Sequence, residues 1–153
     1  SNNNYNILKI KYYKDNISKN CKKITIIWKI DYISTKTDME IGSYDRDLFI
    51  ILEFKKYLEE TLNIEVNINN DYFSDFIYMM YAPKLIISPS TFSFWAAIMS
   101  KKEAILPKCN LLCGNSNPFI RENLYWIDTS NYIITTNDIY KSNDNILLNK
   151  LLE

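Results

Sequence analysis

Apolar side chains recur along this chain with two different periods, and the pattern predicts strands that alternate with helices. Short apolar or alternating runs, rich in β-branched and aromatic residues, are typical of strands. These runs lie at residues 5–12, 23–30, 64–68, 85–87, 103–106 and 124–127. Helical spacing occurs at residues 47–63, 72–81, 91–100 and 145–152.

The clearest amphipathic helix is predicted from Asp47 to Asn63. Its apolar positions, which begin at Phe49 and end at Leu62, recur every three or four residues, while the other face carries charged side chains. The polar segment before it, Ser34 to Tyr44, contains Gly42 and is predicted to be a loop.

Strands that alternate with helices favour a Rossmann-like α/β fold. We expect a mainly parallel sheet with right-handed crossovers and with helices on both faces. A chain of 153 residues buries about 70% of its unfolded surface, so residues 1–153 can form a single domain without disulfides or metals. The chain begins with Ser1 instead of Met, which is compatible with excision from a longer protein with an adjoining domain.

Composition excludes several classes of function. Eighteen Lys and Arg balance eighteen Asp and Glu, so the chain is not expected to bind nucleic acid. The absence of His removes the usual general base and every His-bearing zinc site. The two glycines, Gly42 and Gly114, cannot build a glycine-rich phosphate loop.

Three cysteines, Cys21, Cys109 and Cys113, form neither a CxxC motif nor an even disulfide framework, and we expect reduced, buried thiols. No apolar run reaches the roughly 18 residues of a membrane span, and no signal region opens the chain. We therefore expect a cytoplasmic location.

The most informative segment is a hydroxyl-rich turn between the strand at 85–87 and the helix at 91–100. It carries Ser88, Ser90, Thr91 and Ser93. In an α/β sheet such a turn lies at the carboxyl end of a strand, where free backbone N–H groups and the helix dipole favour a phosphate. The alternative is that Ser90 or Thr91 only caps the helix, which requires no ligand.

The same segment resembles the donor-site motif of the alpha-1,2-fucosyltransferase family. The resemblance begins at Asp75-Phe76, continues through Ser88-Pro-Ser-Thr-Phe-Ser-Phe-Trp-Ala-Ala97, and ends at Lys101-Lys102. It implies the nucleotide-sugar domain of a type B glycosyltransferase, an inverting enzyme that needs no metal or other cofactor. The implied donor is GDP-fucose, and the implied acceptor is a glycan.

Residue by residue, the resemblance implies that the turn contacts the donor through Ser88, Ser90, Thr91, Phe92 and Ser93. Asp75 would face the same crevice. Phe94 and Trp95 are instead expected to pack the helix against the sheet.

The family's upstream phosphate-binding signature corresponds to residues 26–32, where Asp31 matches and Lys29 keeps a positive charge. Lys29 or Arg46 would neutralise the departing phosphate, and Asp31 or Asp75 would accept the acceptor's hydroxyl proton. A single Lys is a point charge and cannot reproduce a bidentate arginine clamp.

Asp45-Arg46-Asp47 also has the form of the DxD signature by which type A glycosyltransferases hold a metal. Because it precedes the helix predicted from Asp47, the alternative is ordinary capping of a helix start. Arg46 is one of two arginines and is the better candidate for a diphosphate partner; the other is Arg121.

Two functions follow from these observations. The first is a glycosyltransferase domain that binds a nucleotide sugar. The alternative is a non-catalytic interaction or scaffold domain that keeps the fold, a hypothesis favoured by the degraded arginine signature and by the lack of His.

Overall fold

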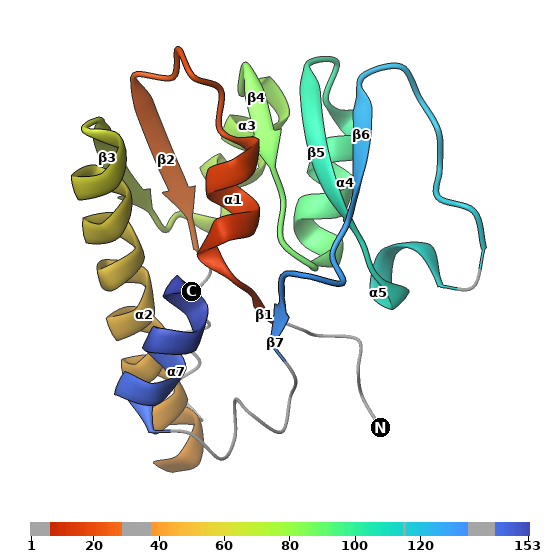
Figure 1. The fold of residues 1–153 in the computed structure, drawn as a ribbon. Coiled ribbons are helices and arrows are strands. Elements are labelled where there is room, and N and C mark those ends of the chain that lie inside the picture. The colour runs from red at the N-terminus through yellow and green to blue at the C-terminus, as the bar shows by residue number, and fades with distance from the viewer. Residues whose placement is uncertain (1–6, 29–37, 115, 135–142) are drawn as a thin grey trace.

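The computed structural model describes residues 7–28, 38–114, 116–134 and 143–153, of which residues 38–46 and 72 are described by their backbone alone. The strands are β1 (Ile7–Leu8), β2 (Lys23–Ile27), β3 (Glu65–Asn69), β4 (Lys84–Ile86), β5 (Glu103–Lys108), β6 (Leu124–Asp128) and β7 (Ile133–Ile134). The helices are α1 (Ile10–Asn16), α2 (Asp38–Leu62), α3 (Tyr72–Tyr81), α4 (Thr91–Met99), α5 (Asn110–Cys113) and α7 (Asp144–Leu152) (Figure 1).

The main strands pair in parallel, as the alternation of strands and helices predicted. β2 pairs with β3, and β5 lies between β4 and β6. Two short segments, β1 and β7, form an antiparallel pair. The class, mixed α/β with parallel strands, is confirmed; the described strands nevertheless form separate sheets of two and three parallel strands and not one continuous sheet.

Helices cover both faces of the β4–β5–β6 sheet, α1 on one side and α3 with α4 on the other (Figure 1). Successive β5 residues point to opposite faces, since side chains alternate along a strand. Ile105 packs with Leu8 and Tyr12. Ala104 and Leu106 lie in the cluster beneath α3 and α4, here called the sheet core.

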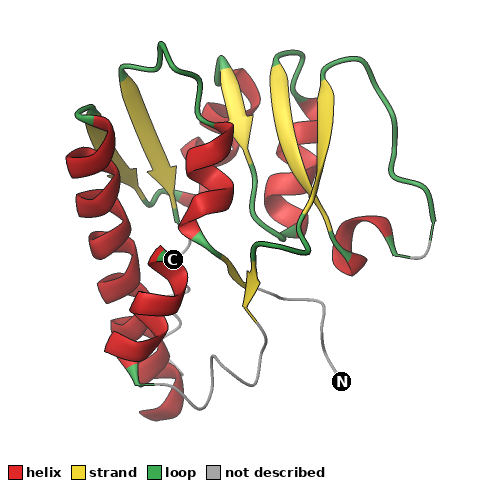
Figure 2. Ribbon diagram, viewed as in Figure 1, coloured by secondary structure: helices red, strands yellow, loops and turns green. Residues whose placement is uncertain are grey.

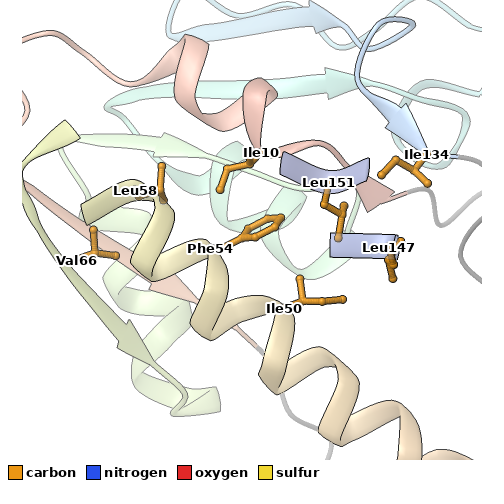
Figure 3. Packing of buried hydrophobic residues seen from close by; sticks show 8 residues of the cluster. All are labelled: Ile10, Ile50, Phe54, Leu58, Val66, Ile134, Leu147 and Leu151. Atoms are coloured by element: carbon orange, nitrogen blue, oxygen red, sulfur yellow. The ribbon is translucent and has the colours of Figure 1, made fainter. Parts of the chain in front are cut away.

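A second cluster, here called the helix core, lies between α2, α7, α1 and the β2–β3 pair. Phe54 of α2 projects toward Leu147 and Leu151 of α7 (Figure 3). The other buried members are Ile10, Ile50, Leu58, Val66 and Ile134. Long aliphatic and aromatic side chains contributed by five elements therefore hold this half together.

The strand predicted at residues 5–12 is wrong at its end, since the strand β1 stops at Leu8 and α1 begins at Ile10. Leu8 and Tyr12 are buried together against Ile105. This tertiary packing decides the conformation of a segment whose short apolar pattern suits either a strand or a helix.

The loop predicted from Ser34 to Tyr44 is also wrong where the structure describes it, because α2 begins at Asp38. Gly42 lies inside this helix, where a glycine costs about 1 kcal/mol relative to alanine. Extending an existing helix needs no new nucleus, so a long helix tolerates such a residue.

The three cysteines are free, but each is half-buried, so the expectation of buried thiols is wrong. Within the described part of the chain, no helix combines the length and the apolar character that crossing a membrane requires.

Candidate functional site

The hydroxyl-rich turn lies where the sequence predicted it, between the carboxyl end of β4 and the first turn of α4. The connection runs below the strands in the view of Figure 2. The carboxyl ends of β5 and β6 point to the same edge, because both pair in parallel with the β4 sheet. The turn therefore belongs to the edge where α/β proteins bind ligands.

Ser90 is the N-cap of α4. Its side-chain oxygen accepts a hydrogen bond from the Ser93 N–H at 3.5 Å, a long distance for such a bond. The Ser93 side chain is buried, and its hydroxyl lies 3.3 Å from the Ser88 carbonyl oxygen and 3.2 Å from the Ser90 carbonyl oxygen. Ser93 thus ties the turn together from inside, whereas Ser90 keeps its hydroxyl proton available to an added acceptor.

Ser88 and Thr91 are exposed at this turn. The Ser88 hydroxyl contacts the Tyr13 phenol, whose pKa burial raises above its ordinary value of 10.0. The Thr91 hydroxyl has no partner among the described residues. Two hydroxyls, those of Ser90 and Thr91, therefore stand at the positive end of the α4 dipole.

The aromatic residues of the motif divide between packing and the surface. Phe92 meets Phe76 of α3 edge to face, with ring centroids 5.3 Å apart. Phe94 lies against Trp126 of β6, as expected for a packing residue. Trp95 is 58% exposed, so the expectation that it packs against the sheet is wrong.

Asp75 lies on α3, near the turn, since the next residue, Phe76, contacts Phe92 in the first turn of α4. Asp75 is only 4% exposed, and its Oδ2 accepts a hydrogen bond from the backbone N–H of Asp71 at 2.7 Å. Asp71 in turn accepts the Ser74 hydroxyl at 2.7 Å. The carboxylate of Asp75 is therefore engaged at its own helix start.

The positions of the other predicted side chains relative to this turn are not described. Lys29 and Asp31 lie outside the described residues. Arg46 belongs to α2, where only its backbone is described. The interpretation of Asp45-Arg46-Asp47 as a helix start is wrong, because α2 begins seven residues before Asp45. The described residues include no group of three or more metal-ligating side chains.

The sequence did not predict that Arg121 caps the carboxyl end of α4 through side-chain hydrogen bonds. Its guanidinium donates to the Ser100 carbonyl at 2.9 Å and to the Ala97 carbonyl at 3.3 Å, both at the carboxyl end of α4. Asn123 accepts from Arg121 and donates to the Ser100 carbonyl. A basic residue at the end of a helix is stabilising, but these donors lie twenty residues and more away in sequence, where no local signal points to them.

A comparison of the chain with family models, with curated proteins and with solved structures finds no match. The geometry by itself favours binding of an anion near the N-terminus of α4, where two hydroxyls and the positive end of the helix dipole meet.

Proposed function

We propose that this chain binds a nucleoside-diphosphate sugar at the carboxyl edge of its parallel strands, as the donor domain of a glycosyltransferase. The observation that carries the proposal is the Ser88–Thr91 turn, which presents the hydroxyls of Ser90 and Thr91 at the start of a nine-residue helix. A diphosphate needs donors and positive potential, and this turn supplies both without glycines.

Chemistry at this site would be metal-independent inversion, with GDP-fucose as the donor that the resemblance implies. In this proposal Lys29 or Arg46 neutralises the leaving diphosphate, and a carboxylate accepts the proton of the acceptor hydroxyl. Asp31 suits the role of base better than Asp75 does, since Asp75 is buried and already accepts the Asp71 N–H.

Calorimetric titration with GDP, UDP and dTDP sugars tests the proposal directly. We expect binding of at least one donor, weakened at least about tenfold, or about 1.4 kcal/mol, by Ser90→Asp. The melting temperature should stay near that of the wild type, because Asp is itself a good N-cap. A negative charge against the diphosphate explains the selective loss of binding.

A matched control exists in α7, whose N-cap Asn143 accepts the Ile146 N–H at 2.9 Å. Asn143→Asp makes the same kind of N-cap away from the proposed site and should leave donor affinity unchanged. If folded Ser90→Asp binds the donor with unchanged affinity, the turn does not bind the diphosphate and Ser90 is only a helix cap.

The second hypothesis, a non-catalytic interaction module, predicts that no donor binds even at millimolar concentration. Donor hydrolysis by a longer protein that contains this domain would count heavily against it.

A further inference from the structure

The outer side of α3 and α4 exposes a set of large apolar side chains, here called the apolar face. Its residues and their exposed fractions are Phe73 (81%), Ile77 (50%), Tyr81 (73%), Trp95 (58%) and Met99 (55%). Within each helix these residues are four apart, which places them in one row along the helix surface.

The two rows lie side by side. Phe76 and Phe92 meet edge to face at the seam between the helices. Phe73 is three residues before Phe76, and Trp95 is three residues after Phe92, so both continue the surface on either side of that seam. The opposite sides of α3 and α4 are buried in the sheet core.

The apolar face carries no exposed charge. Across α3 and α4 the only ionisable acid or base among Asp, Glu, Lys and Arg is Asp75, which is buried and bonded to the Asp71 N–H. A helical layer that faces water normally carries charged residues, so a large uncharged face marks a contact with another protein surface.

We propose that the apolar face binds the same face of a second copy of this chain, so that the protein is a twofold symmetric dimer. Aromatic side chains of this kind bury roughly 150–250 Å² each. At their exposed fractions the three aromatic side chains, Phe73, Tyr81 and Trp95, offer about 400 Å². Ile77 and Met99 add to this area, and each partner in a standard interface buries about 800 Å². The apolar face is therefore large enough to form the apolar centre of a standard interface, with polar residues around it completing the area.

Charges at the two ends of the apolar face favour a second copy over an unrelated partner. Asp71 is exposed just before α3, and Lys101 and Lys102 are exposed just after α4. Each of the two helices connects strands that run in the same direction, β3 and β4 for α3 and β4 and β5 for α4 (Figure 1), so the two helices also run in the same direction. A twofold axis that lies in the interface and perpendicular to the helices stacks α3 on α3 and α4 on α4 of the second copy. Asp71 of one copy then lies at the same end of the interface as the lysines of the other, about one helix spacing, 8–10 Å, to the side.

The same antiparallel arrangement sets the helix dipoles of the two copies in opposite directions, which is favourable. Parallel packing would instead bring like charges together at both ends.

Sedimentation equilibrium or light scattering, over a range of protein concentrations, measures the dimer directly. We expect the chain to dimerise, and Ile77→Lys to raise the dissociation constant at least about tenfold, because a charge is then desolvated at the centre of the interface. Trp95→Glu should act in the same way.

Ile146→Lys is the matched control, since Ile146 is also on a helix and is 48% exposed. It should leave the dimer intact. Circular dichroism should show unchanged folding in all three variants, because the three positions are exposed.

The charge pairing makes its own prediction. Lys101→Glu combined with Lys102→Glu should weaken the dimer, and the loss should shrink at high salt, which screens exposed charges. A wild-type chain that stays monomeric at about 100 μM, well above the dissociation constants usual for interfaces of this size, overturns the proposal. A dimer that survives both Ile77→Lys and Trp95→Glu also overturns it.

Discussion

At the scale of single residues, Arg121 shows how one side chain closes a helix. α4 ends at Met99, and the carbonyls of Ala97 and Ser100 are satisfied by the Arg121 guanidinium. Asn123 also donates to the Ser100 carbonyl, so Arg121 contributes charged hydrogen bonds at a buried helix end and is not the sole donor there.

We expect Arg121→Met to lower the free energy of unfolding by about 1 kcal/mol, because charged hydrogen bonds are lost while both carbonyls keep another donor. Methionine keeps most of the aliphatic volume, so the loss reports on the hydrogen bonds. Urea unfolding followed by circular dichroism measures it. Lys101→Met, at an exposed position near the same helix end, is the control and should change stability little.

Tyr12 supplies a pH-dependent contribution to stability. Its residue is fully buried, its hydroxyl donates to the Ile87 carbonyl at 3.1 Å, and burial raises the pKa of the phenol well above its ordinary value of 10.0. The folded state therefore keeps a proton that the unfolded state releases. Stability from this group is complete below pH 10 and is lost as the pH rises further.

The wild-type melting temperature should accordingly fall between about pH 9.5 and 11.5, a window set by the ordinary tyrosine pKa. Tyr12→Phe should be less stable at neutral pH, since the Ile87 bond is gone, but should show a shallower alkaline decline. Tyr125→Phe, at a half-exposed tyrosine, is the control. An alkaline decline of equal steepness in wild type and Tyr12→Phe would contradict this account.

At the scale of elements, the sequence predicted best where local signals agreed. α3 begins at Tyr72 and ends at Tyr81 as predicted, because a periodic apolar run ends just before Pro83. β5 and β6 follow from apolar runs of strand length.

Elements decided by distant contacts could not be predicted in the same way. α1 is a helix because Tyr12 reaches Ile87 and Ile105 across the fold. The candidate site divides similarly. The cap role of Ser90 was readable as a hydroxyl before an apolar helix, whereas the engagement of Asp75 by the Asp71 N–H depends on side-chain conformation.

At the scale of the whole molecule, α1 links the two hydrophobic clusters. Ile10 belongs to the helix core, while Tyr12, two residues later, packs with Ile105 of the central strand. Thr25 of β2 and Tyr78 of α3 add a hydroxyl contact of 3.0 Å between the two halves. We therefore expect the helix core and the sheet core to unfold together, as is usual for a single domain of this size.

Leu151→Ala tests this coupling, because Leu151 is fully buried in the helix core and contributes nothing to the sheet core. The substitution leaves a cavity and should cost about 2–5 kcal/mol. Trp28 follows β2 and is replaced by Phe in this test. Tryptophan fluorescence then reports on Trp95 of α4 and on Trp126, which packs against the sheet core, whereas circular dichroism reports on all the helices. In urea both signals should shift to the same lower midpoint. A fluorescence transition that keeps the wild-type midpoint while the circular dichroism midpoint falls would show that the two cores unfold independently.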